Sequence, residues 1–386
     1  MPDGREPVTA RVTERIGTVD AAQWDACAGG DNPFVSHAFL AALEDSGSVE
    51  AETGWLPQHL LVEDAAGALC AAAPMYLKGH SYGEYVFDHG WAAAYERAGG
   101  HYYPKLQVAV PFTPVPGPRL LVRPGPSADT VRRTLIQAMV EVARRHKVSS
   151  LHVTFASEAD SRALAEAGLM LRAGYQFHWT NPGYDSFEDF LAALSSRKRK
   201  AIRKERREVA ESGIEIRALT GDAIEEQHWD AFYGFYISTS DRKWGSPYLT
   251  REFFSRLGER MADRIVLVMA EDRGRPVAGA LNLRGTDALY GRNWGCDGDY
   301  RFLHFEACYY QAIEYAIAHR LARVEAGAQG EHKIQRGYLP VMTHSAHWIR
   351  DEPFAAAVEG FLRREQLAVE QDIRTLADYS PFRRGN

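Results

Sequence analysis

Two stretches of the chain share one pattern of apolar and polar positions. Residues 60–77 (LLVEDAAGALCAAAPMYL) run from an apolar segment through a polar turn with a glycine into a second run of small apolar residues. Residues 266–283 (VLVMAEDRGRPVAGALNL) follow the same order. Two short apolar runs around a glycine-bearing turn are typical of a β-hairpin. The pattern therefore predicts one hairpin in each half of the chain.

A similar succession of elements is predicted after each hairpin. In the first half, apolar spacing predicts a helix over 127–146 and strands over 148–155 and 169–179. In the second half it predicts a helix over 302–320, strands over 322–328 and 341–349, and a closing helix over 353–378. Chance similarity of two hairpins is the alternative, but the shared order of later elements argues against it. We therefore expect an α/β protein of two tandem units, each a mixed sheet flanked by helices.

Breaker residues mark the expected boundary between the units. Asn181-Pro182-Gly183 follows the last predicted strand of the first half, which gives units over 1–181 and 182–386. The second unit begins with a predicted helical segment over 186–212.

Within that segment, residues 197–207 (RKRKAIRKERR) hold eight basic residues against one acid. Charges this dense repel one another, and a polyanion would relieve the repulsion. A solvated linker helix is the alternative. The candidate phosphate contacts are Arg197, Lys198, Lys200, Arg203 and Lys204.

Composition narrows the class of protein. The chain has 386 residues, 45% of them hydrophobic and 25% charged, which is typical of globular domains. A net charge of −6 argues against a protein that coats nucleic acid, so we expect no DNA partner. No secretory signal and no long apolar run is visible, which predicts a cytoplasmic protein without a membrane span. His344 and His347 would face opposite sides of a strand, so we expect no metal site.

Four longer stretches resemble one known family. They are NPFVSHAFLAALEDSG (32–47), PFTPVPGPRLL (111–121), LHFEACYYQAIEYAI (303–317) and EAGAQGEHKIQRGYLPVMTHSAHWI (325–349). Together they are similar to the bacterial FemAB-like predicted N-acyltransferases of the GCN5-related N-acyltransferase superfamily. The resemblance covers almost the whole chain. It implies a tandem acyltransferase fold, and Fem-like enzymes take their acyl group from aminoacyl-tRNA.

Amide formation from an activated donor needs two things from the protein. The acceptor amine, with a pKa near ~10, must lose a proton, and the oxyanion needs a hydrogen-bond donor. A strand N–H freed where two strands part can serve as that donor. In the second unit these strands are 289–294 and 322–328. Glu325 lies on the latter, on the face opposite Val324, and is the candidate base. A structural salt bridge or an exposed edge is the alternative for Glu325.

The densest polar cluster follows Glu325. His332 is a second candidate proton handler, while Lys333 and Arg336 are candidate phosphate contacts. Gln329 and Tyr310 are candidate substrate contacts. A polar surface loop is the alternative interpretation of this cluster.

Aromatic residues alternate after Tyr82. Tyr85, Phe87, His89 and Trp91 would lie on one face of a predicted strand. Core packing is the default for such a face. A stacking surface for substrate, formed by Tyr85 and Trp91, is the alternative.

Neither half has the glycine-rich phosphate loop of the superfamily. Residues 295–301 carry Asp297 and Asp299, whose charges repel phosphate, and residues 113–119 hold three prolines, which lack an N–H. We therefore expect no tightly bound cofactor, and a co-substrate that is aminoacyl-tRNA or acyl-CoA.

The sequence thus predicts an N-acyltransferase acting on an amine-bearing small molecule or peptide, with tRNA as a possible partner. A non-catalytic module that recognises a cell-wall precursor or a nucleotide-linked ligand is the rival. An acetyltransferase with an unusual CoA pose is a third interpretation.

Overall fold

The computed structural model describes residues 8–243, 247–327 and 330–383. The chain forms two compact units. Unit 1 comprises Met1–Gly174 and Thr343–Glu370, and unit 2 comprises Tyr175–Met342 and Gln371–Asn386. This grouping differs from the contiguous units 1–181 and 182–386 expected from the sequence, because a C-terminal segment of the chain belongs to unit 1. Where each acyltransferase-like unit begins and ends stays a prediction.

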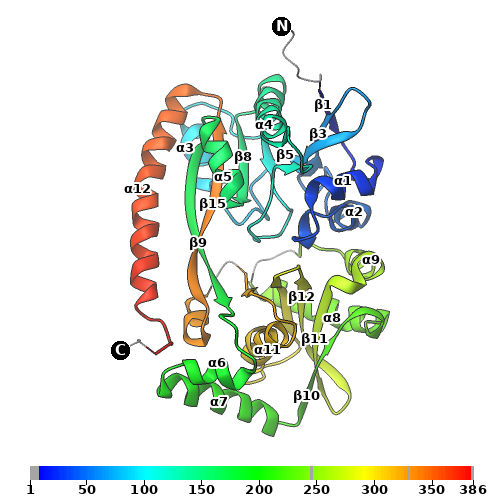
Figure 1. Cartoon of the computed structure of the whole chain (residues 1–386), viewed down its shortest axis with the longest axis vertical. Helices are drawn as coiled ribbons and strands as arrows, with labels where there is room; N and C mark the ends of the chain where they lie inside the picture. Colours follow the sequence, from blue (N-terminus) through cyan, green and yellow to red (C-terminus); the bar gives the residue numbers. More distant parts are fainter. Residues whose placement is uncertain (1–7, 244–246, 328–329, 384–386) are drawn as a thin grey trace. The chain divides into compact units, whose positions relative to one another are not determined.

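Strands β9 (Met170–Thr180) and β15 (Leu339–Ile349) and helix α12 (Glu352–Ala377) contribute residues to both units. They confirm the predicted strands over 169–179 and 341–349 and the closing helix over 353–378. The remaining strands of unit 1 are β1 (Thr9–Thr13), β2 (Trp55–Pro57), β3 (His59–Glu63), β4 (Leu69–Ala73), β5 (Met75–Lys78), β6 (Lys105–Val108), β7 (Leu121–Val122) and β8 (Ser150–Ala156). Its helices are α1 (Ala21–Ala28), α2 (His37–Asp45), α3 (His89–Arg97), α4 (Ala128–Arg145) and α5 (Glu158–Glu166) (Figure 1).

The predicted hairpin of unit 1 is confirmed, with β3 antiparallel to β4. Strand β5 continues the chain after β4 and pairs antiparallel with β6, which pairs in parallel with β8. Helix α4 confirms the helix expected over 127–146. Its buried Leu135 and Met139 pack with Leu106, Val108 and Val153 of the sheet. One face of the unit 1 sheet therefore carries the apolar core.

Unit 2 alternates helices and strands. Its helices are α6 (Phe187–Ala193), α7 (Ser196–Glu211), α8 (Glu226–Lys243), α9 (Arg251–Met261), α10 (Leu303–Phe305) and α11 (Gln311–Ala318), the last two joined by a π-helical turn, Glu306–Tyr310. Its strands are β10 (Ile214–Leu219), β11 (Ile265–Asp272), β12 (Arg275–Arg284), β13 (Ala288–Cys296) and β14 (Arg323–Glu325).

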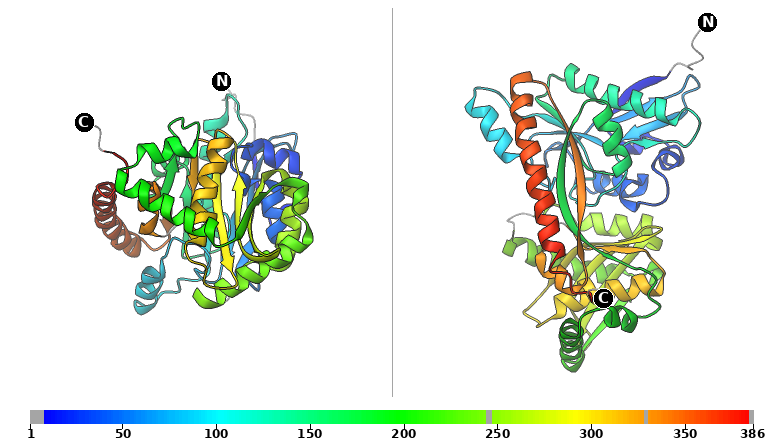
Figure 2. Two further views of the ribbon diagram at one scale, coloured as in Figure 1. Left: turned by 90° about the horizontal axis from the view of Figure 1, so that it is seen from below. Right: turned by 60° about the vertical axis from the view of Figure 1, so that its left-hand side comes forward.

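Helices cover both faces of the unit 2 sheet. The second predicted hairpin is confirmed as the antiparallel pair β11–β12. On β12, Ala280 packs against Ala307 of the π-helical turn, whereas a side chain at Gly279 would meet Phe232 of α8. Neighbouring residues of a strand point to opposite faces, so α8 and the α10–α11 segment lie on opposite sides. The left view of Figure 2 shows the gold and lime-green helices on either side of the yellow strands.

The connection that follows the hairpin region differs in length between the units. In unit 2, β12 and β13 are joined by residues 285–287, but in unit 1 residues 79–104 separate β5 from β6. The predicted aromatic strand after Tyr82 is wrong: residues 79–88 are irregular and α3 begins at His89. The reason is that Glu84 and Asp88 turn inward to bind Lys105, which breaks the alternation of a strand.

Candidate functional site

Strands β13 and β14 part where the sequence predicted. They pair in parallel from Ala288 with Arg323 to Tyr290 with Glu325. Beyond Tyr290, β13 continues to Cys296 while its pairing among the described residues is with β12 alone. Backbone N–H groups at such a point can stabilise an oxyanion.

Glu325 is buried at the end of this pair, with 4% of its surface exposed. Its Oε1 accepts a hydrogen bond of 2.9 Å from Arg323 Nε. Its Oε2 lies 3.7 Å from His178 Nε2 and accepts no hydrogen bond from any residue that the structure describes. Burial raises the pKa of Glu325 to about 7, although Arg323 acts in the opposite direction. Glu325 is thus a carboxyl that exchanges protons near neutral pH, with one oxygen unengaged.

The groups around Glu325 are polar and held in place. Burial lowers the pKa of His178 to about 3, so its ring is neutral at physiological pH. Arg323 also contacts Asp287 at the surface and donates to Tyr290 Oη at 3.3 Å. The guanidinium therefore fixes one carboxylate oxygen of Glu325 and leaves the other available.

Most of the candidate residues that follow Glu325 form hydrogen bonds with other residues of the chain. His332, Lys333 and Arg336 lie on a 3₁₀ helix, Glu331–Arg336. The exposed His332 forms a hydrogen bond of 2.8 Å with Tyr309 Oη. Lys333 is buried and donates to Gly327 O at 2.9 Å, and burial lowers its pKa to about 8.

Arg336 is buried too, and its partner comes from the basic helix. It donates to both oxygens of Glu205 at 3.0 Å and lies over the ring of Phe305. Tyr310 is fully buried and donates its hydroxyl to Glu205, so it packs in the core of unit 2 rather than lining a surface. Gln329 lies outside the described residues.

The predicted helix over 186–212 is present as α6 and α7, which lie side by side in unit 2 (Figures 1 and 2). Arg197, Lys200, Arg203 and Lys204 are exposed, and Lys198 is half-buried. A groove of about 420 Å³ runs along α7, with Arg203, Arg206 and Arg207 in its wall. Arg206 forms ion pairs with Glu306 and Glu314, and the more exposed Arg203 and Arg207 form surface ion pairs with Glu188 and Glu211.

Unit 1 holds a buried polar layer that the sequence interpretation missed. Strand alternation turns Leu106 and Val108 to the apolar core, and the intervening residues face the other way. On that second face the sheet carries the buried polar residues Lys78, Lys105, Gln107, Ser150, His152, Thr154 and His347, together with the buried Trp55, Tyr76 and Ile349. Such a face inside a domain is unusual, because each polar group needs a partner there.

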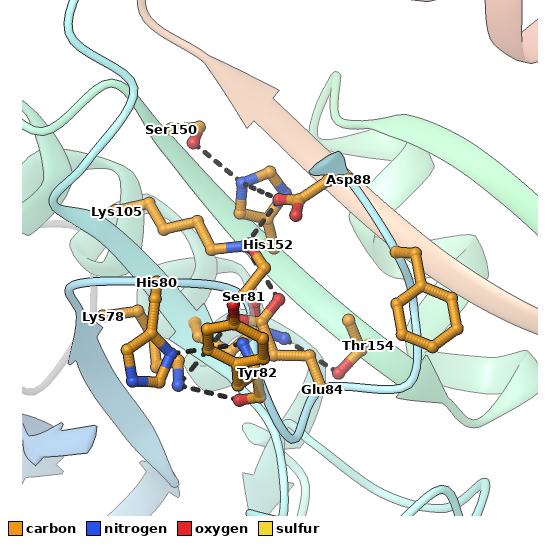
Figure 3. Close-up of polar contacts among 12 residues, drawn as sticks. Lys78, His80, Ser81, Tyr82, Glu84, Asp88, Lys105, Ser150, His152 and Thr154 are labelled. Carbon is orange, nitrogen blue, oxygen red and sulfur yellow. Dashed lines mark hydrogen bonds and ion pairs between the residues drawn. The ribbon is translucent and has the colours of Figure 1, made fainter. Parts of the chain in front are cut away.

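Lys105 is the centre of this layer, and Figure 3 shows it reaching toward Ser81 and Asp88. Its Nζ donates to Ser81 Oγ at 2.8 Å, to Glu84 Oε2 at 2.7 Å and to Asp88 Oδ2 at 2.5 Å. All three partners come from the connecting residues 79–104. Burial alone would raise the pKa of Asp88, but Lys105 and His152 hold it below its usual range. Lys105 therefore fastens the connection over the sheet.

Lys78 lies opposite Lys105 in the β5–β6 register. Its Nζ is 3.5 Å from the centre of the Trp55 ring and 4.0 Å from Glu84 Oε1. Burial lowers the pKa of Lys78 to about 7 and raises that of Glu84 to about 7. The layer thus contains the close ion pair Lys105–Asp88 and a longer contact between Lys78 and Glu84.

The two predicted aromatic contacts of unit 1 lie near this layer but not on a common strand face. Trp91 is buried on α3 and packs edge-on against His347, with Arg172 over its ring. Tyr85 is half-buried in the irregular connection with a φ of 60°. His347 and His152 are in contact through their Nδ1 atoms at 2.6 Å. The sequence of β8, SLHVTFA, could have revealed the polar layer. Its polar residues alternate with apolar ones, so they share one face of a strand, and that face is buried when helices cover both sides of the sheet.

Two further features bear on what the chain can bind. No group of three or more His, Cys, Asp or Glu side chains suited to a metal ion occurs within residues 8–243, 247–327 and 330–383. Over the same residues, no helix combines the length and apolar character needed to cross a bilayer.

Known structures share this fold at low sequence identity. A crystal structure of FemX matches with a TM-score of 0.55 and 11% identity, over 88% of this chain and 98% of that one. The C-terminal domain of a putative lysylphosphatidylglycerol synthetase from Agrobacterium fabrum matches with a TM-score of 0.52 and 10% identity, over 88% and 94%. L-PGS from Bacillus licheniformis matches with a TM-score of 0.50 and 10% identity, over 87% and 98%. No curated protein matched the sequence.

The family is shown by the sequence itself. Residues 15–384 match the FemAB-like family model, described as peptidoglycan biosynthesis/recognition. This match and the fold shared with FemX confirm the mixed α/β class, and the family description supports a role in peptidoglycan biosynthesis or recognition. The chain therefore belongs to the FemAB-like family.

Proposed function

We propose that the protein is an N-acyltransferase that forms an amide on an amine acceptor, with aminoacyl-tRNA or acyl-CoA as donor. The observation that supports it most is Glu325 Oε2. This oxygen accepts no hydrogen bond among the described residues, and it belongs to a carboxyl with a pKa of about 7 where β13 and β14 part. A general base is most effective when its pKa lies near the working pH.

In the proposed reaction, the amine nitrogen bonds to the acyl carbon and the bond from that carbon to the donor's oxygen or sulfur breaks. Glu325 accepts the proton that the nitrogen gives up. His332, exposed and oriented by Tyr309, is the proposed source of the proton that the leaving oxygen or sulfur takes up. The N–H groups of β13 beyond Tyr290 are the proposed oxyanion donors.

The donor is assigned by a discharge assay. The purified protein is incubated with a mixed pool of charged tRNAs and acyl-CoAs and candidate amine acceptors, and mass spectrometry shows which donor loses its acyl group. Glu325→Gln should lower turnover about 10²–10⁴-fold. Asp287→Asn, which removes a surface carboxylate from the same Arg323, should stay near wild type. Equal turnover of Glu325→Gln and wild type would remove Glu325 from the mechanism, and ligand binding without any discharge would favour the non-catalytic module.

We assign phosphate contact to the exposed basic residues of α7 rather than to Lys333 and Arg336, because both of these are buried with partners of their own. If tRNA is the donor, its affinity should fall steeply with salt. Replacing Arg197, Lys200, Arg203 and Lys204 by Ala should lower the slope of log K against log salt by about 0.7–0.9 for each phosphate that the variant no longer neutralises. An unchanged slope would contradict this assignment. The exposed Arg145 and Arg162 of unit 1 serve as control positions.

A further inference from the structure

The polar layer of unit 1 contains several acceptor atoms that nothing in the described chain satisfies. Glu84 Oε1, Asp88 Oδ1 and Gln107 Oε1 are buried and accept no hydrogen bond from any described residue. The three side chains are 4%, 3% and 0% exposed. Buried acceptors are paired in nearly all native structures, so a donor from outside the chain would satisfy these three atoms.

The charge of Glu84 is only partly compensated. Lys105 Nζ binds both Glu84 and Asp88, and Lys78 Nζ lies 4.0 Å from Glu84 Oε1. Burial still raises the pKa of Glu84 to about 7 in spite of these two lysines. A further cation would allow Glu84 to stay ionised.

Aromatic faces around the layer already hold ammonium groups. Lys78 Nζ sits 3.5 Å from the centre of the Trp55 ring. Lys105 Nζ lies 5.8 Å and 5.9 Å from the ring centres of Tyr102 and Tyr103. Rings combined with carboxylates are the surroundings that favour an alkylammonium group over a neutral or anionic one.

We propose that the polar layer of unit 1 is a binding site for a primary amine in its ammonium form, with Glu84, Asp88 and Gln107 as hydrogen-bond acceptors. Residues 79–88 cover the site, since Lys105 is bound by Ser81, Glu84 and Asp88 of this segment. The site needs no acyl donor and does not involve Glu325, so it is independent of the proposed transfer reaction.

Calorimetry on the full chain at pH 7 tests the proposal with four amines: methylamine, ethanolamine, glucosamine and lysine. N-acetylglucosamine is the matched neutral probe, because it differs from glucosamine by loss of the charge. At least one amine should bind saturably and N-acetylglucosamine should not. An ammonium beside Glu84 drives its carboxyl to the ionised form, so binding should release up to about half a proton per site. Titrations in phosphate and MOPS, whose ionisation enthalpies differ and neither of which is a primary amine, measure that release.

Two variants separate the site from general effects on folding. Glu84→Gln should weaken amine binding at least tenfold and abolish the proton release. Glu44→Gln is the control, since Glu44 is a buried carboxyl of unit 1 whose oxygens are both partnered, by His59 at 2.7 Å and by Ile16 N at 2.9 Å. It should bind like the wild type. Absence of binding by all four amines, or equal binding by Glu84→Gln, would show that water alone fills the layer and would overturn the proposal.

Discussion

The two units differ in the connection between two neighbouring antiparallel strands, β5 and β6 in unit 1 and β12 and β13 in unit 2. In unit 2, residues 285–287 close the turn between β12 and β13, and the sheet next to it is covered by helices. In unit 1, residues 79–104 replace that turn and lie over the polar face of the sheet, fastened by Lys105. Each unit nevertheless contains one buried glutamate with a pKa raised to about 7, Glu84 and Glu325.

The difference lies in what surrounds each glutamate. Glu84 belongs to the covering segment 79–88 and lies between two lysines of adjacent strands. Glu325 is held on one side by Arg323, which continues to Asp287 at the surface, at the point where two strands part. Unit 1 is thus suited to enclose a charge, and unit 2 to exchange a proton. Variants of the two sites test that contrast.

The largest effect is expected for Lys105→Met. This change leaves Glu84 and Asp88 buried without their cation, and breaking a buried ion pair in this way costs about 3–5 kcal/mol. Urea unfolding measures the free energy of unfolding. Arg11→Met is the control in the same unit, because the Arg11–Glu63 pair is at the surface and should contribute less than about 1 kcal/mol. Similar losses for both variants would remove Lys105 from its central place in unit 1.

An intermediate effect is expected in the pH dependence of stability. The pKa values of Glu84 and Glu325 are higher in the folded than in the unfolded chain, so both contribute stability at low pH that is lost as pH rises from about 4.5 to 7. Glu84→Gln and Glu325→Gln cannot ionise. Relative to wild type, each should therefore gain on the order of 2 kcal/mol between pH 5 and pH 7. Denaturant titrations at these two pH values measure the gain, and a relative loss in either variant would contradict the assigned direction.

The smallest effect is expected on the outer side of the unit 1 connection. Tyr82 is 62% exposed. Its hydrogen bond with Lys78 uses the backbone oxygen of Tyr82, at 3.2 Å, and does not involve the Tyr82 side chain. Tyr82→Ala should change the free energy of unfolding by less than about 0.5 kcal/mol, because exposed side chains contribute little. Thermal melting of this variant beside Lys105→Met shows whether the stability of the connection lies in its inward-facing residues. A large loss for Tyr82→Ala would place it in the outward-facing ones instead.

Local patterns were enough to predict most of the fold. The two hairpins and the helix over 127–146 follow from apolar periodicity and from turn residues. The parting of β13 from β14 was expected from the family resemblance and from the need for an oxyanion donor. The sequence also singled out Glu325, because a charged residue inside a short buried strand is unusual.

What the sequence could not provide were contacts between distant residues. Lys105 binds Glu84 and Asp88 across a long connection, and no periodicity reveals such an ion cluster. The aromatic alternation from Tyr85 to Trp91 instead suggested a strand that those inward-turned carboxylates prevent. Likewise, Arg336 was expected to meet a ligand, but Glu205 reaches it from a helix far away in the sequence.

The pH profile of kcat/KM for acyl transfer tests the central claim most directly. If Glu325 removes the proton from the acceptor amine, the rate should rise with pH through a midpoint near 7, where this carboxyl ionises. Glu325→Gln should lose that midpoint together with most of the rate, while Asp287→Asn keeps the rate and moves the midpoint slightly lower, because Asp287 helps to raise the pKa of Glu325. A wild-type profile without an inflection near pH 7, or the same inflection in Glu325→Gln, would contradict the assignment of Glu325 as the base.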